Sequence, residues 1–212
     1  MKSWRHYSGF RFACTSLKDR LAGGLVCALF ALACQHEPDP RSVRGALDAA
    51  ATAVAARDGK RLFRIVDQRA RHALESIVKD RHEAARLIRT DYPEAERAAA
   101  LGALGDAASV TTSADLFALR CAQACMSELA QRIAAPVSEA QMGVELVVRT
   151  ARGASLRLYH GDDRWWGLVW NTDALSHERD QAAQDLLQIR TNAEVYQKRR
   201  ALEAQAPSTR PR

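Results

Sequence analysis

The sequence predicts an α+β fold with a helix-rich N-terminal two-thirds, a three-stranded antiparallel meander and a long C-terminal helix. Apolar residues recur at helical spacing over most of residues 43–134. Apolar and polar residues then alternate in short runs between residues 144 and 170. The last stretch is polar, with a single narrow apolar seam. These three patterns give the order of helices, sheet and final helix.

The first 33 residues are predicted to be a signal peptide. A segment ending at Arg20 holds five basic residues and one acidic residue, and the thirteen residues from Leu21 to Ala33 are uncharged. That run is too short for a membrane-spanning helix, which needs about 20 apolar residues. A basic segment, a short apolar segment and small residues before a cleavage point are typical of secretory signals.

The end of this segment, Ala31-Leu32-Ala33-Cys34, resembles the lipobox of bacterial lipoprotein precursors. The resemblance implies that Cys34 is acylated and becomes the first residue of a lipid-anchored protein of the cell envelope. Such a protein would face the periplasm, and Gln35 after the cysteine favours the outer membrane over the inner. The same residues also fit the A-x-A pattern of ordinary signal peptidase, which would leave Cys34 without lipid.

The cysteine count favours acylation. Cleavage before Cys34 leaves three cysteines, and an odd number in an oxidising compartment needs an explanation. Acylation leaves the pair Cys121 and Cys125, four residues apart on a predicted helix. Cβ atoms at that spacing are about 5–6 Å apart, whereas disulfides prefer about 3.5–4.5 Å. We expect a disulfide, formed most easily where the helix loosens or ends; two buried free thiols are the alternative.

The charge of the chain excludes a nucleic-acid partner. The formal net charge is +6, but the first 34 residues hold five basic and one acidic residue, which leaves only +2 on the remainder. Binding to nucleic acid would need a basic stripe on the folded domain. Here the two signs are interspersed.

After a short tether over residues 34–42, we expect one globular domain over 43–172, a long helix over 173–206 and a disordered tail over 207–212. Helices are predicted from Val43 onward, interrupted at Asp58-Gly59 and at Tyr92-Pro93, and a further helix is predicted from Ala114 to about Ala134, before Pro136. Strands are predicted over 144–149, 156–160 and 166–170, with glycine-bearing turns between them.

The final helix is predicted from Ala174 to about Ala204. Its apolar residues recur at alternating spacings of four and three, which gives a narrow seam as in a coiled coil: Ala182, Leu186, Ile189, Ala193 and Tyr196. An isolated helix of this kind is marginal and needs a surface to pack on. We therefore expect a protein partner along this helix.

Two segments, ARDGKRLFRIVD at 56–67 and DDRWWGLVW at 162–170, are similar to exported members of the nuclear-transport-factor-2-like superfamily. The resemblance implies helices packed into a curved sheet around a conical pocket. The chain departs from that pattern in its three predicted strands, its long helical part and its long final helix. No functional residue carries over, because the superfamily includes catalytic and non-catalytic members.

No catalytic motif is present, and neither a metal site nor a cofactor is expected. His160, close to Asp162 and Asp163, is the best acid–base candidate, but Gly-Asp-Asp is ordinary turn chemistry. Aromatic residues gather in the meander, where Trp166 and Trp170 are expected to anchor the core. The candidate binding residues are Tyr159, His160, Trp165 and Trp166.

These observations predict a non-catalytic envelope lipoprotein that acts as a protein-interaction or structural module at the membrane surface. The alternative is a small-molecule or glycan binder, or a weak hydrolase, with a pocket between the helices and the meander.

Overall fold

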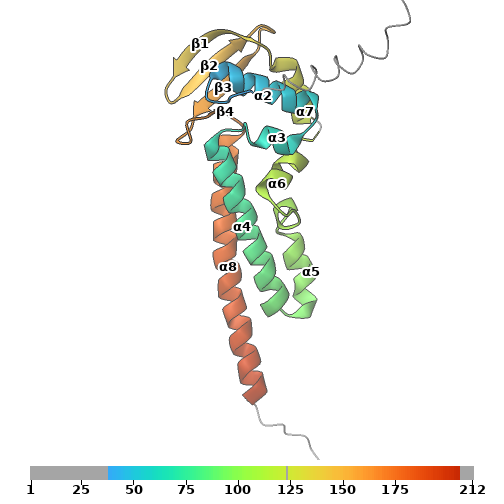
Figure 1. Cartoon of the computed structure of the whole chain (residues 1–212). Coiled ribbons are helices and arrows are strands. Elements are labelled where there is room, and N and C mark those ends of the chain that lie inside the picture. Colours follow the sequence, from blue (N-terminus) through green and yellow to red (C-terminus); the bar gives the residue numbers. More distant parts are fainter. Residues whose placement is uncertain (1–37, 123, 206–212) are drawn as a thin grey trace, which may run out of the picture. The chain divides into compact units, whose positions relative to one another are not determined.

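The computed structural model describes residues 38–122 and 124–205, which combine helices with a four-stranded antiparallel sheet (Figure 1). The predicted mixture of helices, antiparallel sheet and long C-terminal helix is confirmed, whereas the prediction of three strands is wrong. The predicted signal peptide, Cys34 and the tail over 207–212 lie outside the described residues.

The helices begin and end where the sequence carries capping and breaking residues. The side chains of Ser42, Asp58, Asp67 and Thr112 each accept a hydrogen bond from a first-turn backbone N–H of the helix that follows. The helices are α2 (Val43–Ala55), α3 (Gly59–Phe63), α4 (Gln68–Asp91), α5 (Glu94–Gly102), the 3₁₀ helix η1 (Asp106–Ala108), α6 (Ser113–Arg120), α7 (Ala124–Arg132) and α8 (Thr172–Gln205).

The sheet follows the chain in the order β1 (Pro136–Met142), β2 (Glu145–Thr150), β3 (Ser155–His160) and β4 (Trp166–Leu168), and each strand pairs with the next. Leu146 pairs with Leu158, which pairs with Leu168, so these three buried side chains share one face. The carbonyl of Pro40 accepts a hydrogen bond from the Trp166 N–H at 2.9 Å, which fixes the end of the tether against β4.

Strand β1 is the strand that the sequence does not predict. Its first residue, Pro136, is half-buried, and the six that follow are exposed. β1 forms one edge of the sheet, and proline is tolerated at the first position of an edge strand. Because almost nothing of β1 is buried, its sequence carries no alternation of apolar and polar residues.

Helices α4 and α8 lie side by side and run parallel, both starting at the sheet (Figure 1). Ion pairs join them in register, Arg81 to Asp185 at 2.6 Å and Arg200 to Asp91 at 3.0 Å. Within the predicted seam of α8, Ala182, Leu186 and Ala193 are buried. The surface that this seam needs is therefore largely supplied by α4 of the same chain.

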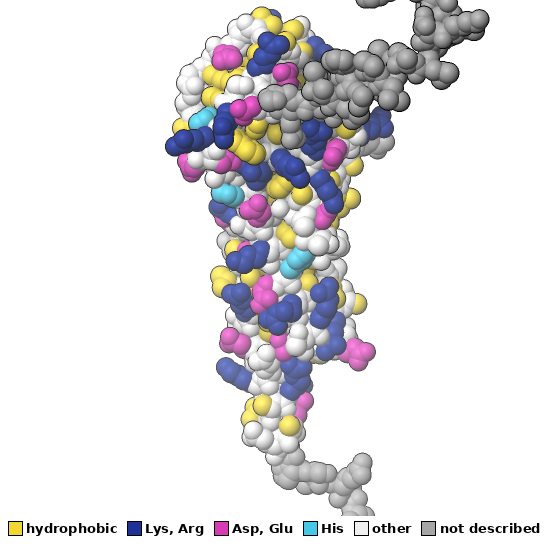
Figure 2. Space-filling model, viewed as in Figure 1, with side chains coloured by type: hydrophobic (Ala, Val, Ile, Leu, Met, Phe, Trp, Pro, Cys, Tyr) yellow, Lys and Arg dark blue, Asp and Glu magenta, His cyan; other side chains and the backbone are white. Residues whose placement is uncertain are grey.

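Two clusters of buried apolar side chains result. The first, here called the sheet core, joins α2, α3, the first half of α4, α6 and strands β2–β4; its largest fully buried members include Leu47, Leu62, Leu74, Phe117 and Leu158. The second, the helix-pair core, lies along α4 and α8 and consists of Ala84, Ala85, Leu87, Ile88, Tyr92, Leu104, Leu186 and Ala193. On the face seen in Figure 2, basic and acidic side chains are interspersed over both regions.

Candidate functional site

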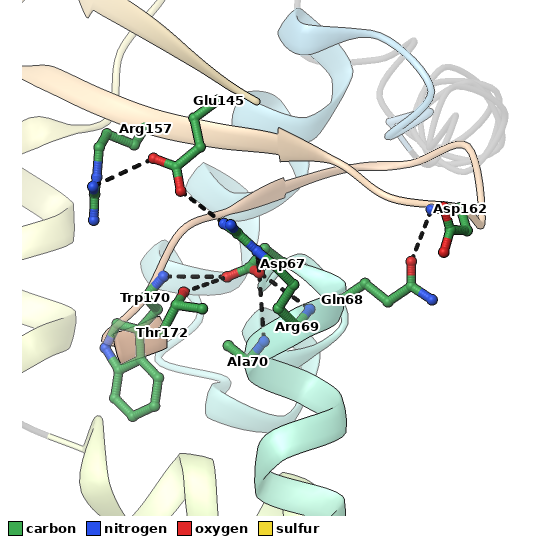
Figure 3. A network of polar contacts seen from close by, with 9 residues as sticks. All are labelled: Asp67, Gln68, Arg69, Ala70, Glu145, Arg157, Asp162, Trp170 and Thr172. Atoms are coloured by element: carbon green, nitrogen blue, oxygen red, sulfur yellow. Dashed lines mark hydrogen bonds and ion pairs between the residues drawn. The ribbon is translucent and has the colours of Figure 1, made fainter. Parts of the chain in front are cut away.

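A buried carboxylate joins the sheet to the two long helices (Figure 3). Asp67 is fully buried and caps α4, where its Oδ1 accepts hydrogen bonds from the backbone N–H groups of Arg69 at 3.1 Å and Ala70 at 3.4 Å. Its Oδ2 accepts from the Trp170 N–H at 3.4 Å and from the Thr172 hydroxyl at 3.3 Å, where α8 begins. One side chain thus binds the start of both helices.

The position of Asp67 also has an electrostatic reason. Two parallel helices bring two partial positive charges together at their N-termini, and a negative side chain there is stabilising. Strand β4 approaches the same residue closely, because a Cβ on Gly167 would lie 2.5 Å from the Asp67 Cα. Glycine at 167 is therefore needed for β4 to reach Asp67. We regard this network as the structural junction of the domain.

Arg69 extends the junction to the sheet. Its Nε donates to Asp67 Oδ1 at 3.0 Å, its Nη2 donates to Glu145 at 2.8 Å, and its guanidinium lies 4.1 Å from the centre of the Tyr159 ring. Burial lowers the pKa of Arg69, but the hydrogen bonds to Glu145 and Asp67 outweigh it and the net pKa is raised. Glu145 is also paired with Arg157 at 3.3 Å.

A cavity of about 460 Å³ lies beside this junction, between the helices and the end of the meander. Its apolar lining comes from three helices, α3, α6 and α7, and from two strands, β3 and β4, together with the residues that directly follow α3 and β4. It includes Leu62, Val66, Phe117, Leu129, Leu156 and Trp170. Its polar lining includes Arg120, Glu128, Arg132, Ser155, Arg157 and Asn171. Binding pockets for small molecules typically measure about 300–1,000 Å³ and combine an apolar lining with a few polar groups.

The helical wall of the cavity contains the disulfide. Cys121 and Cys125 lie at disulfide distance, with Cα atoms 4.8 Å apart, and Cys125 lines the cavity. The continuous helix predicted from Ala114 to Ala134 is wrong, because α6 ends at Arg120 and α7 begins at Ala124. Regular helical spacing holds two such cysteines too far apart, so the break at this point is what lets the sulfur atoms meet.

Arg120, on the same wall, is held by two carboxylates. Its guanidinium donates to Asp106 through Nε and Nη2 and to Glu178 through Nη1 and Nη2, at 2.8–3.0 Å. These hydrogen bonds raise the pKa of Arg120, and its guanidinium holds the pKa of Asp106 below the usual value of 3.8. The pairs fix α6 to η1 and to the first part of α8.

The four predicted binding residues lie around the β3–β4 turn, away from the lining of this cavity. Tyr159 lies under Arg69, and the His160 ring packs against the Trp166 ring at 5.0 Å between centres. Trp165 is 38% exposed, as expected for the ring on the outer side. Trp166 and Trp170 are partly buried against the sheet core, as predicted.

The cavity residues Arg132, Arg157 and Trp170 were not predicted as binding residues. Trp170 was expected in the core, and it does pack on Phe117, with ring centres 4.7 Å apart, but it also faces the cavity. Arg132 and Arg157 come from the end of a helix and the middle of a strand, 25 residues apart in sequence. No spacing rule connects such a pair before the fold is known.

Asp162 contributes its backbone N–H, and Asp163 its carboxylate, to contacts at the β3–β4 turn. The Asp162 N–H donates to Gln68 at 2.8 Å, and Asp163 pairs with Arg71 at 2.5 Å.

Within the described residues, no group of three or more His, Cys, Asp or Glu side chains is placed to hold a metal ion. No described helix is long and apolar enough to cross a membrane.

Residues 56–67 and 162–170, on which the expected superfamily resemblance rests, meet in this structure. The end of the first, at Asp67, contacts the end of the second, at Leu168 and Trp170. The sheet and the helices leave a cavity beside this contact. No family model, curated protein or solved structure matches this chain.

Proposed function

We propose that this chain is a non-catalytic envelope lipoprotein whose domain binds a small molecule in the cavity between α3, α6, α7 and the end of the meander. The observation that supports binding is the cavity itself, with about 460 Å³ of space and a lining that combines apolar and polar side chains. This favours the alternative of a ligand binder over a partner at the α8 seam, because α4 covers much of that seam.

The membrane anchor proposed at Cys34 is compatible with this role. Pro40 is bound to β4, so a fixed point of the domain lies six residues after the cysteine that we propose is acylated. Six extended residues span at most roughly 20–22 Å. The domain would therefore work close to the membrane surface.

Blocking the cavity tests the binding function. Ala124 is an exposed residue that lines the cavity, so Ala124→Trp should fill it without disturbing the core. Ala130→Trp, on the same helix and outside the cavity lining, is the matched control. Native mass spectrometry of the mature protein purified from envelopes should detect a bound small molecule in the parent and in Ala130→Trp, but not in Ala124→Trp. Equal occupancy in the two variants would rule out this cavity.

The anchor needs its own test. Intact mass of the membrane-extracted protein should show loss of residues 1–33 and added acyl chains on Cys34, since two or more chains give stable anchoring. Cys34→Ser should move the protein to the soluble fraction or block its maturation. A fully processed Cys34→Ser protein that stays in the membrane fraction would refute the anchor.

A second candidate function, protein binding, is favoured by one observation. On α8, Leu187, Val195 and Leu202 are 62%, 57% and 69% exposed, at spacings that place them on one side of the helix. Deleting the helix would also expose the helix-pair core, so surface substitutions test this better. Crosslinking in intact cells should lose a specific partner when these three residues become glutamine, and keep it when Arg190 and Gln197, exposed on another side of the helix, become alanine.

A further inference from the structure

We propose that the free edge of strand β1 is an interaction surface for a second copy of this chain, whose own β1 pairs with it antiparallel about a twofold axis at Ala140. The surface is separate from the cavity of the proposed binding function, which is lined by residues of β3 and β4 but none of β1. The inference follows from a difference between the two edges of the sheet.

The chain covers only one edge of its own sheet. At β4, the Leu168 N–H donates to the carbonyl of Ile65 at 2.7 Å, and the Leu168 carbonyl accepts from the Asp67 N–H at 2.9 Å. At β1, on the opposite edge (Figure 1), the described part of the chain supplies no such backbone partner to residues 137–142. Alternate residues of an edge strand direct their N–H and C=O groups away from the sheet, so β1 offers a row of unpaired backbone groups.

Protection of this edge is confined to one end of β1. Pro136 begins the strand, and the pairing register with β2 shifts between Pro136 and Ser138. Proline, bulges and charges are common means by which proteins block edge pairing. From Ser138 to Met142 the register is regular, and Glu139 is the only charged residue. Val137 and Met142 are 67% and 65% exposed, so this stretch can receive another strand.

The C-terminal end of this chain cannot fill the edge. Helix α8 starts at the sheet (Figure 1), and its 34 residues carry the chain about 51 Å away. Only seven residues follow Gln205, and seven extended residues span at most roughly 23–25 Å. They are too few to return to β1.

The N-terminal end of the mature chain is also too short. Pro40 is held at β4, which is three strand spacings, or about 14 Å, from β1. Cleavage before Cys34, which intact mass tests separately, leaves six residues before Pro40. Six extended residues span at most roughly 20–22 Å, so crossing the sheet leaves about two of them to pair. The strand must therefore come from another molecule.

A second β1 fits this edge in one symmetric register. A closed dimer uses the same surface on both copies, so the two strands pair about a twofold axis. With the axis at Ala140, Glu139 lies opposite Gln141 of the second copy. The Gln141 amide has two N–H groups and uses one to donate to the Gly143 carbonyl at 2.9 Å, so the other can donate to this carboxylate. An axis at Glu139 would place two carboxylates opposite each other, which is destabilising, and an axis elsewhere shortens the overlap.

The same register covers apolar side chains that are exposed in the single chain. Ser138, Ala140 and Met142 share one face of β1, since alternate residues of a strand point the same way. Met142 then lies opposite Ser138 and diagonal to Ala140 of the second copy, within reach of its long side chain. Five paired positions are a small contact beside the roughly 1,200–2,000 Å² of stable interfaces, so the dimer should exchange with monomer.

Engineered cysteines trap such a dimer and report its register. The mature protein purified from envelopes should form a disulfide-linked dimer on oxidation with diamide when it carries Ala140→Cys, because the two Cα atoms then lie about 4.5–5.5 Å apart. Ser138→Cys, on the same face of β1, is the matched control. It should give no dimer beyond that of the parent, because the two copies of residue 138 lie about 13 Å apart along the strands.

A mixture of two variants tests the same register without a substitution at the axis. Ser138→Cys and Met142→Cys proteins, oxidised together, should give the mixed dimer. Ala140→Lys, added to both, places two like charges opposite each other and should reduce the mixed dimer by about fivefold. Ala140→Ser, added to both, is the control and should leave the mixed dimer unchanged.

Each of the other outcomes overturns the proposal. Equal dimer formation by Ser138→Cys and Ala140→Cys, or no dimer above the parent's in Ala140→Cys, excludes twofold pairing at Ala140. A mixed dimer that survives Ala140→Lys undiminished excludes it as well. In intact cells, a disulfide from Ala140→Cys to a different protein, without the dimer, would assign the edge to that protein instead of a second copy.

Discussion

The sheet core and the helix-pair core are built from the same chain by different means. The sheet core buries large side chains from several helices and three strands, and it leaves a cavity at its edge. The helix-pair core combines three small residues, Ala84, Ala85 and Ala193, with larger apolar side chains from α4 and α8, and its flanks are held by ion pairs such as Arg81–Asp185. Small side chains let two helices approach closely and pack without voids.

The difference indicates a division of roles. Elements of unequal length and direction meet in the sheet core, where a wall of side chains can surround a ligand. The helix pair also borders a cavity, of about 480 Å³, but charged side chains of α4, α5 and α8 dominate its lining, and α8 runs past the end of α4 (Figure 1). The two cavities therefore differ in the kind of side chain that surrounds them. Asp67 is the residue that couples the two cores.

The largest expected effect comes from breaking this coupling. Asp67→Ala should lower the free energy of unfolding by about 3 kcal/mol, because it removes a helix cap, leaves buried donors without their acceptor and takes from Arg69 one of its two carboxylate partners. Asp58→Ala, which removes the exposed cap of α3, is the control and should cost about 1 kcal/mol. Urea denaturation measures both, and a loss for Asp67→Ala no larger than for Asp58→Ala would show that the junction is not the coupling element.

A second prediction concerns the close contact of the helix pair. Ala193 is 2% exposed, so Ala193→Leu should destabilise the protein by about 2 kcal/mol through overpacking. Ala201→Leu, at an exposed position of the same helix, should leave the stability nearly unchanged. Binding in the cavity should survive in Ala193→Leu at temperatures where the protein is folded. Loss of binding in the folded variant would mean that the two cores are not independent.

The sequence predicts the helix pair better than the cavity, for a physical reason. The α8 seam and the end of α4 at Tyr92-Pro93 follow from local spacing and backbone chemistry, and both are confirmed. Strand β1 is missed because it is exposed and so lacks an apolar pattern. The break between α6 and α7 is missed because no proline or glycine marks it in the sequence between Ala114 and Ala134.

The candidate site is harder to predict than any single element. The aromatic cluster is correctly placed in the meander, but its members near the β3–β4 turn pack on Arg69 and on each other. The cavity gathers residues from five elements, and Arg132 of α7 reaches β3 only through its hydrogen bond to the Ser155 carbonyl. Tertiary packing, which no local pattern encodes, creates this site.

A third prediction concerns the disulfide, which belongs to the sheet core and not to the helix-pair core. Cys121→Ala with Cys125→Ala should lower the free energy of unfolding by about 1 kcal/mol, because a bridge between residues four apart closes a very short loop. The free energy of ligand binding should weaken by more than the free energy of unfolding does, since Cys125 lines the cavity and the bridge fixes the start of α7. Adding a reductant to the parent protein should lower its stability and its ligand binding in the same way. Unchanged binding in the double variant would show that the wall holds its shape without the bridge.

The smallest expected effect is pH-dependent and involves the Arg120 contacts. Hydrogen bonds from Arg120 hold the pKa of Asp106 below its usual 3.8, so this carboxylate stabilises the fold fully above that pH and ceases to do so as the pH falls through the lower folded pKa. Asp106→Asn imitates the protonated side chain. At pH 6 this variant should be less stable than the parent by less than about 1 kcal/mol, since solvent partly screens the Arg120–Asp106 pair. The deficit should disappear as the pH is lowered past the folded pKa, and it should shrink at high salt near pH 6. Thermal unfolding across this pH range provides the measurement. A deficit that stays constant down to pH 2 would assign the stabilisation to packing of η1 rather than to the charge on Asp106.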